Sequence, residues 1–307
     1  MLPSAVGTRH TKSRMLPRFA HSRSKQLSAL CFIVPGAFIL THFALATSKR
    51  YFEFQWQSSS EVLFGSRLRE AEALNRSDTV MPKVTGYYIN LLSRPDRRVA
   101  VEVQLSKLGI QIVRVEASDV RNNDTSLAGC WDRSDLKRCA GKIGCKLSHL
   151  KALAVAEKNR DDIALIFEDD FAWLSHVNPV NIPDILLGFD EKFPHWKVIG
   201  LSMNIMQQVH AEPHVDVLVG NNTNATVVRV TDAQTTHGYA IRNSYIPTLR
   251  ATFESCAVHA QLHIAIDQCW KPLQPVDFWY GFSPQLGTQK PGFSDIEDMH
   301  VEYKIAA

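Results

Sequence analysis

The sequence predicts an α/β fold, with a mixed, mostly parallel sheet covered by helices on both faces, over residues 83–307. Two observations carry this prediction. Short runs of apolar, β-branched and aromatic residues alternate with longer segments of helical periodicity, in the order strand, helix, strand, loop, helix, strand. The strand-like runs are also nearly continuous in their apolar residues, which is typical of strands buried on both faces.

The first predicted unit joins a strand to a helix. The run Tyr-Tyr-Ile-Asn-Leu at 87–91 is apolar and rich in strand-forming residues. Ser93 is a suitable helix cap, and Pro95 stands where proline is tolerated, at the start of a helix. We expect this helix over 97–108, with Gly109 ending it.

The remaining elements follow from the same patterns. A helix is expected over 143–159, with Ile143, Leu147, Leu150 and Ala154 on its inner face. It leads into a strand at 162–167. Further strands are expected at 111–115, 197–201 and 227–230, and further helices at 244–253 and 259–269.

Charge is distributed unevenly along the chain. Charged residues make up 21% of the 307 residues and the net charge is only +3, so nothing in the composition calls for a nucleic-acid partner. The first acidic residue is Glu53, whereas six Lys and Arg residues lie between Arg9 and Lys25. The sequence therefore begins with a basic tail, residues 1–28.

An apolar run at 29–47 follows this tail and lacks charged residues. As a helix it would span about 30 Å of hydrocarbon. The basic residues lie mainly before it, which predicts a type II signal-anchor with a cytosolic tail, a stem at 48–82 and a lumenal domain. Two alternatives stay open: a signal peptide cleaved after the small residues 44–46, and an organelle transit peptide.

Two features are typical of the secretory route. Four acceptor sequons for N-glycosylation occur, at Asn75, Asn123, Asn221 and Asn224. In an oxidising lumen, Cys130 with Cys139 and Cys256 with Cys269 would each close a short loop, leaving Cys145 as the odd thiol. Spacing does not fix this pairing, so buried free thiols are the alternative.

Three adjacent carboxylates, Glu168, Asp169 and Asp170, come directly after the predicted strand at 162–167. Their mutual repulsion costs free energy unless a cation or solvent relieves it. Ligands of parallel sheets bind at the carboxyl ends of the strands, and Mg²⁺ or Mn²⁺ in such sites is commonly held by carboxylates together with substrate phosphates. The trio therefore predicts a metal site for a diphosphate substrate; the alternative is a solvated acidic turn.

Four segments, taken together, resemble glycosyltransferase family 25, the family of bacterial lipooligosaccharide and eukaryotic collagen galactosyltransferases. They are similar to its opening I-N-L-x-x-R-x-D-R, to the strand and turn after it, to its G-C-x-x-S-H motif and to its E-D-D. In this chain they lie at 88–98, 114–119, 144–153 and 164–170. Weaker similarities occur at 236–241 and 265–267.

The resemblance implies a GT-A-like domain that uses a nucleotide-sugar, with a UDP-sugar as the expected donor, and Mn²⁺ or Mg²⁺ held by Asp169 and Asp170. It also implies that the closing segment 283–296 covers the donor site as a lid. The residues it implies for binding the nucleotide or its phosphates are Asn90, Arg94, Arg97, Asp119, Ser148, His149 and Lys290. For the arginines the alternative is an exposed helix start, and for His149 a hydrogen-bonded core histidine.

The resemblance also implies transfer with inversion, and an inverting transferase needs a base for the acceptor hydroxyl. Asp267 is the first candidate, with Asp277 and Glu168 behind it. His259, His263 and Asp267 are spaced four apart, so on one helix they would share a face and offer an alternative metal site.

The sequence thus predicts an inverting, metal-dependent glycosyltransferase of the Golgi or ER membrane, moving a sugar, with galactose the candidate, to a glycan or glycoprotein. One alternative is a catalytically silent glycan-binding module of the same fold. Another is a metal-dependent phosphohydrolase, which would need more His and Asp ligands than the sequence offers.

Overall fold

A computed structural model describes residues 82–121, 130, 136–257 and 264–302. The chain divides into two units, Met1–Glu61 and Val62–Ala307, and every described residue belongs to the second. The expected tail, anchor and nearly all of the expected stem lie outside the described residues. Among the described residues, no helix has the length and apolar character needed to cross a bilayer.

The central feature is a seven-stranded sheet in which six strands follow the order β2-β1-β3-β7-β5-β8 and β6 pairs with β7. Its strands are β1 (Val84–Asn90), β2 (Gln111–Glu116), β3 (Ile163–Glu168), β5 (Val198–His210), β6 (Asp216–Gly220), β7 (Thr223–Arg242) and β8 (Trp279–Ser283). The pairs β1–β2, β1–β3 and β5–β8 are parallel, and every pairing of β7 is antiparallel. The sheet is therefore mixed as expected, but the prediction of mostly parallel pairing was wrong, because β7 runs against all its neighbours.

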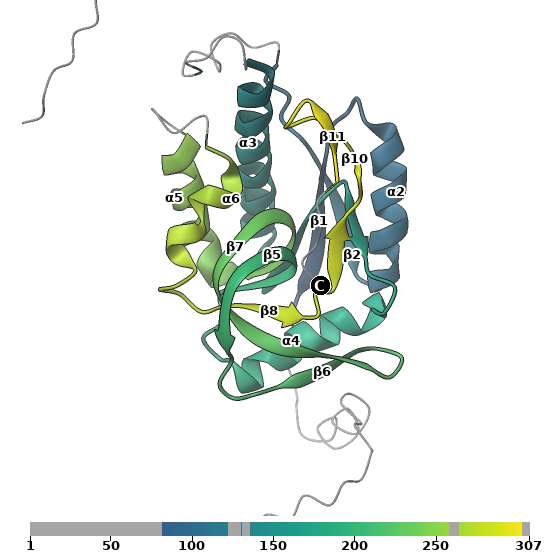
Figure 1. The fold of residues 1–307 in the computed structure, drawn as a ribbon, viewed down its shortest axis with the longest axis vertical. Helices are drawn as coiled ribbons and strands as arrows, with labels where there is room; N and C mark the ends of the chain where they lie inside the picture. Colours follow the sequence, from purple (N-terminus) through teal and green to yellow (C-terminus); the bar gives the residue numbers. More distant parts are fainter. Residues whose placement is uncertain (1–81, 122–129, 131–135, 258–263, 303–307) are drawn as a thin grey trace, which may run out of the picture. The chain divides into compact units, whose positions relative to one another are not determined.

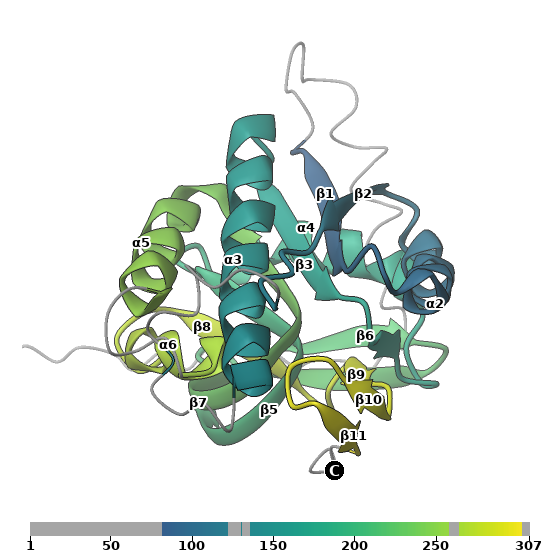
Figure 2. The same cartoon turned by 90° about the horizontal axis from the view of Figure 1, so that it is seen from above.

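Helices cover both faces of the sheet, as predicted. Alternate residues of β1 and β3 point into two separate cores. One core packs the sheet against α2 (Pro95–Leu105) and α4 (Ile182–Lys192). The other packs it against α3 (Leu136–Asn159), α5 (Ile246–Ala257) and the short α6 (Ile266–Cys269). In Figures 1 and 2, α3 and α5 lie side by side, with α2 across the sheet from them.

The first helix and the turn after it begin and end at or near the residues that the sequence predicted. Pro95 is the first residue of α2, and Gly109 ends the following 3₁₀ turn with a left-handed φ of 68°. Val101 and Leu105, both on α2, are fully buried. The predicted cap at Ser93 was wrong: Arg94 occupies the capping position, and no side chain caps the helix.

Helix α3 is longer than predicted. It starts at Leu136 rather than 143 and includes Gly141 and Gly144, which lower helix propensity and obscured its first turns. Of the four residues expected on its inner face only Ile143 is buried; the buried side runs through His149, Ala152, Leu153 and Ala156 instead.

The later strands also extend beyond their predicted ranges: β5 continues to His210 and β7 spans twenty residues. The helix expected at 244–253 exists as α5. The one expected at 259–269 begins, within the described residues, only at Ile266. Short 3₁₀ turns occupy Ser106–Leu108, Pro179–Asn181, Asn243–Tyr245 and Lys271–Leu273.

Two small antiparallel sheets bring the C-terminal segment to the end of β3. Strand β4 (Phe171–Trp173), directly after the acidic trio, pairs with β9 (Gly287–Gln289). Strands β10 (Gly292–Ser294) and β11 (Met299–Val301) form a hairpin that follows β9. The C-terminal segment therefore lies against the same edge of the sheet as the carboxylates (Figure 2).

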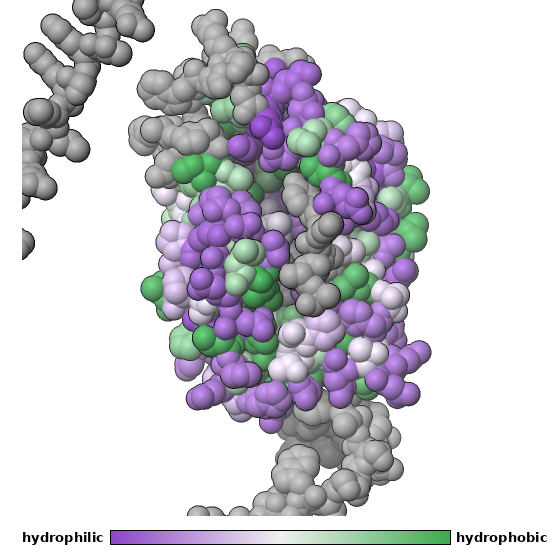
Figure 3. Space-filling model, in the orientation of Figure 1, coloured by the Kyte–Doolittle hydropathy of each residue, from purple (hydrophilic) through white to green (hydrophobic). Residues whose placement is uncertain are grey.

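Both predicted disulfides are present, and Cys145 is free. Cys130–Cys139 ties the loop after β2 to α3, and Cys256–Cys269 ties the end of α5 to α6. On the face shown in Figure 3, polar and apolar residues are interspersed, and the apolar ones form no single large patch.

Candidate functional site

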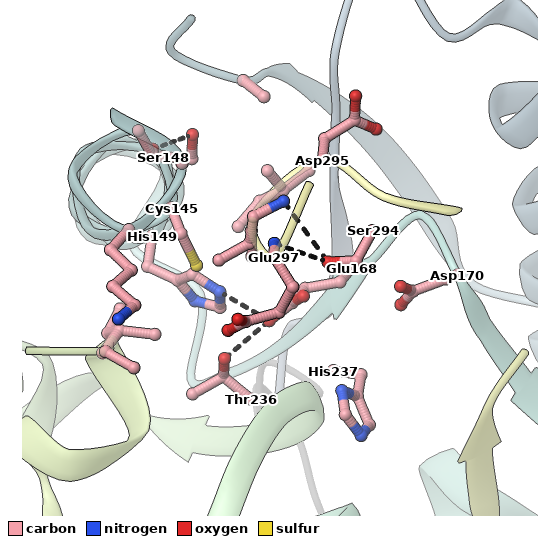
Figure 4. A pocket seen from close by; sticks show the side chains of 18 of the residues that line it. Cys145, Ser148, His149, Glu168, Asp170, Thr236, His237, Ser294, Asp295 and Glu297 are labelled. Atoms are coloured by element: carbon pink, nitrogen blue, oxygen red, sulfur yellow. Dashed lines mark hydrogen bonds and ion pairs between the residues drawn. The ribbon is translucent and has the colours of Figure 1, made fainter. Parts of the chain in front are cut away.

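The acidic trio lies at the carboxyl end of β3, and each carboxylate has a different set of partners. Glu168 is the last residue of the strand and is held from two sides. His149 Nε2 of α3 lies 3.2 Å from its Oε1, and Thr236 Oγ1 of β7 donates to the same oxygen at 2.6 Å (Figure 4). Burial opposes the charge, but the hydrogen bond from His149 and the nearby His149 and His237 rings lower the pKa of Glu168.

Asp169 contacts the first strand and helix of the domain. Asn90 Nδ2 donates to its Oδ2 at 2.8 Å, and Arg97 Nη1 lies 2.9 Å from its Oδ1. Burial nevertheless raises the pKa of Asp169, because these partners offset only part of the desolvation cost. Arg97 also donates to the carbonyl of Phe293 at 2.6 Å, which joins α2 to the C-terminal hairpin.

Asp170 is the least satisfied of the three. Gln289 Nε2 donates to its Oδ2 at 2.8 Å, and Arg97 is more distant, at 3.5 Å. Its Oδ1 is buried and has no hydrogen-bond partner among the described residues. Burial and the neighbouring Glu168 charge raise the pKa of Asp170 to about 7. A buried carboxylate oxygen without a donor is the feature that a cation would complete.

The geometry also defines which side chains could share such a cation. Ligand atoms of Glu168, Asp170 and His237 lie within 4.8 Å of one another, and those of Cys145, His149 and Glu168 form a second such group. Carboxylate oxygens with one imidazole suit Mn²⁺ or Mg²⁺, whereas the thiol-containing group suits softer metals. The metal role predicted for Asp170 fits this arrangement. For Asp169, which lies outside both groups, it stays a prediction.

A pocket of about 370 Å³ opens beside the trio. It is lined by all three carboxylates and by five further residues singled out from the sequence: Arg97, Asp119, Ser148, His149 and Asp267. Residues from the first strands, α3, β7, α6 and the C-terminal hairpin all reach it. Residues from segments far apart in the chain therefore meet at one pocket, and eight of them are among those that the sequence predicts as site residues.

Asn90 and Arg94 do not line the pocket but support it from behind. Asn90 is buried, donates to Asp169 and accepts from Arg114 Nε at 3.1 Å. Arg94 pairs with Asp96 at 3.0 Å and with Asp295 at 2.5 Å. Their predicted contact with the nucleotide is therefore indirect in this arrangement.

The other predicted nucleotide-binding residues differ in how they are placed. Asp119 pairs with Arg121 at 2.5 Å, and this hydrogen bond lowers the pKa of Asp119. Ser148 uses its hydroxyl within the fold, accepting from Ser118 N at 2.8 Å and donating to Gly144 O at 2.6 Å. Lys290 contributes its backbone N–H to the Asp170 carbonyl at 2.8 Å, and it does not line the pocket.

The candidates for the general base differ in their hydrogen bonds and in whether they line the pocket. Asp267 Oδ2 accepts from the backbone N–H of Thr235 at 3.1 Å, while its Oδ1 is buried without a partner among the described residues. Asp277 accepts from the Tyr245 hydroxyl and does not line the pocket. His259 and His263 lie outside the described residues, so the alternative metal site on their helix stays a prediction.

The C-terminal hairpin lies over the pocket at its helix α3 side. Ser294, Asp295, Ile296 and Glu297 line the pocket. Asp295 also contacts Arg121 at 3.4 Å. A Cβ on Gly141 of α3 would come within 2.6 Å of the Ile296 backbone, so the hairpin packs directly on the helix.

Several site residues received no role from the sequence. His237 and Thr236 belong to a segment whose similarity to the family was noted, yet their convergence on Glu168 depends on the path of β7. Arg121 pairs with the site from a segment that carries no motif, whereas Gln289 and Asp295 belong to the closing segment 283–296, which was expected to cover the donor site but in which neither residue was given a role. Only the three-dimensional pairing of distant segments reveals these residues.

Comparison with known proteins places the chain among sequence families. The model of a family described as glycosyltransferase family 25 (LPS biosynthesis protein) matches residues 84–270. No curated protein matches the sequence.

Solved structures with a similar fold include a glycosyltransferase involved in the glycosylation of the major capsid of PBCV-1. It is 12% identical, covers 71% of this chain and 98% of its own, and has a TM-score of 0.39. A UDP-glucose pyrophosphorylase in complex with UDP-glucose is 10% identical, covers 67% of this chain and 91% of its own, and has a TM-score of 0.38.

Proposed function

The chain belongs to glycosyltransferase family 25, and we propose that it transfers a sugar from a nucleoside-diphosphate donor to a glycan or glycoprotein, with Mn²⁺ or Mg²⁺ and with inversion at the sugar carbon. A UDP-sugar, with galactose as the candidate sugar, is the proposed donor. One pair of observations carries the metal dependence. Among the described residues, Asp170 Oδ1 is buried without a hydrogen-bond partner, and ligand atoms of Asp170, Glu168 and His237 lie within 4.8 Å of one another.

In this proposal Asp170, Glu168 and His237 would hold the cation, and a bound cation would offset the charge of the diphosphate and improve it as a leaving group. Arg97 and Arg121 line the same pocket and supply planar, multidentate donors suited to phosphate oxygens. The negative charge that develops on the leaving diphosphate is thus met by fixed positive groups.

Asp267 is the proposed general base. The N–H of Thr235 fixes one carboxylate oxygen, and the other is free of partners among the described residues. As the acceptor oxygen bonds to the sugar carbon, the bond from that carbon to the phosphate oxygen breaks and its electron pair leaves with the diphosphate. The hydroxyl proton passes to Asp267.

A donor panel tests the proposal. Purified full-length protein is assayed for transfer and for donor hydrolysis with a series of nucleotide-sugars, with Mn²⁺, with Mg²⁺ and with EDTA. We expect turnover of one donor that requires the metal and falls at least a hundredfold in Asp170→Ala. The control Glu191→Gln alters an exposed acidic residue on α4 and should keep full activity. Binding of glycans without turnover of any donor would instead support a silent glycan-binding module.

We also propose that the enzyme is a type II protein of the Golgi or ER membrane, with residues 29–47 as its anchor and the catalytic domain in the lumen. Two disulfides within the domain support an oxidising compartment. Protease protection of the domain in sealed microsomes is the expected result; digestion without detergent would contradict it.

A further inference from the structure

The backbone of β7 departs from regular strand geometry beside the carboxylates. Asn204 of β5 pairs with Gln234, whereas Ser202 pairs with Gly238. Three residues of β7, at positions 235–237, therefore face the single residue Met203 of β5. This is a bulge of more than the usual one extra residue, and bulges commonly re-aim side chains next to functional sites.

Thr235 carries the bulge in a strained conformation. Its φ is 68°, in the left-handed region that β-branched residues rarely adopt. Such a conformation costs free energy and persists only where neighbouring groups enforce it. Two hydrogen bonds do so here: Thr235 N–H donates to Asp267 Oδ2 at 3.1 Å, and Thr235 Oγ1 accepts from Asn204 N at 3.2 Å.

The consequence is visible in the two residues that follow. In a regular strand, consecutive side chains point to opposite faces. Here Thr236 bonds to Glu168 while His237 lies within 4.8 Å of both Glu168 and Asp170, so both converge on the carboxylates (Figure 4). All four residues from Gln234 to His237 line the pocket.

We propose that Thr235 is a positioning residue, whose left-handed backbone, clamped by Asp267 and Asn204, turns His237 toward the cation site. This inference rests on the proposed function. It gives Asp267 a second role: besides facing the acceptor, its carboxylate sets the geometry of the metal ligands by holding the Thr235 amide. The two roles respond differently to substitution, because an amide oxygen can accept the Thr235 hydrogen bond but cannot serve as the base.

Mn²⁺ affinity of the full-length protein, measured by calorimetry without any donor, separates the roles. Asp267→Asn and Asp267→Ala remove the same charge and the same base, so both should lose transfer activity. Only Asp267→Ala also removes the hydrogen-bond acceptor. We therefore expect Asp267→Ala to bind Mn²⁺ at least tenfold more weakly than Asp267→Asn. Equal Mn²⁺ affinity in the two variants would contradict the proposal that the Asp267 carboxylate sets the metal-site geometry by holding the Thr235 amide.

Substitutions at Thr235 provide an independent measurement. Thr235→Val keeps the strained β-branched backbone but loses the hydroxyl, and should weaken Mn²⁺ binding about tenfold. Thr235→Gly loses the hydroxyl but adopts a positive φ freely, and should stay within about threefold of wild type. Thr231→Val, on the same strand outside the pocket, is the matched control.

Pulsed electron paramagnetic resonance of bound Mn²⁺ reports the histidine directly, through its coupling to the imidazole nitrogen. We expect this coupling in wild type and Thr235→Gly, and its loss in Thr235→Val at saturating Mn²⁺. Unchanged affinity and unchanged nitrogen coupling in Thr235→Val would overturn the inference while leaving the proposed function intact. Wild-type protein that binds no Mn²⁺ would instead overturn the metal dependence itself.

Discussion

At the scale of single residues, Asp170 shows how burying a carboxylate in the site lowers the free energy of unfolding. In the metal-free protein, burial and Glu168 raise its pKa to about 7 from a usual value near 4. The folded state therefore binds a proton more tightly than the unfolded chain does. The stability associated with this proton is complete below pH 4 and is lost as the pH rises to about 7.

Asp170→Asn should remove this loss of folding stability with rising pH. With EDTA present, we expect the variant to melt at a higher temperature than wild type at pH 7.5, and the difference to shrink as the pH approaches 4. Each kcal/mol corresponds to roughly 2–4 °C for a domain of this size. Differential scanning calorimetry at several pH values measures it. A variant that melts lower than wild type at pH 7.5 would show that Asp170 is stabilising without a cation.

At the level of the element, the Cys256–Cys269 disulfide ties α5 to α6, which carries Asp267. Replacing both cysteines by serine should lower the free energy of unfolding by about 2–4 kcal/mol, because the loop is no longer closed in the unfolded chain. Chemical denaturation checks this value. The Asp267 clamp should loosen too, so Mn²⁺ affinity should fall together with stability.

The C-terminal hairpin places a carboxylate among the arginines of the site. Asp295 contacts Arg94 behind the pocket at 2.5 Å and Arg121, which lines the pocket, at 3.4 Å. It therefore occupies, in Arg121, a guanidinium that suits a diphosphate. Asp295→Asn should therefore bind UDP more tightly in the presence of Mn²⁺, by about three- to tenfold, as measured by calorimetry. The control Asp298→Asn changes a hairpin residue that does not line the pocket. Weaker UDP binding in Asp295→Asn would mean that Asp295 assists the donor.

Local signals predicted the elements whose ends are marked in the sequence. Pro95 and Gly109 bracket the first helix and its 3₁₀ turn, and the apolar run before Glu168 is a strand. The bulge at Thr235 was not predicted. The left-handed backbone of this threonine is held by a hydrogen bond to Asp267, which lies 32 residues away in the sequence. The early turns of α3 were missed because its glycines serve close packing rather than helix propensity.

The site could be predicted in part for the same reason. The carboxylates are adjacent in sequence, and their place after a buried strand fixed their position at the edge of the sheet. The contacts of Arg97 with Asp169 and of His237 with the trio depend on which strands pair, and sequence patterns do not specify that pairing.

At the scale of the whole molecule, the proposed lumenal placement makes the sequons testable. Asn221 lies in the turn between β6 and β7 and Asn224 at the start of β7; both are exposed, and neither lines the pocket. We expect the protein made in a secretory host to carry glycans there, and glycosidase treatment to increase its mobility on a gel. Asn221→Gln combined with Asn224→Gln should reduce the shift. Absence of any shift in the wild-type protein would argue against a lumenal domain.

A cation that links the carboxylates to the donor is the central element of the proposed function. Calorimetric titration of UDP into the full-length protein, with Mn²⁺ and with EDTA, tests this link most directly. We predict that UDP binds with Mn²⁺, that its affinity falls at least tenfold in EDTA, and that Asp170→Asn with Mn²⁺ resembles wild type in EDTA. UDP binding of equal strength in all three cases would contradict the account.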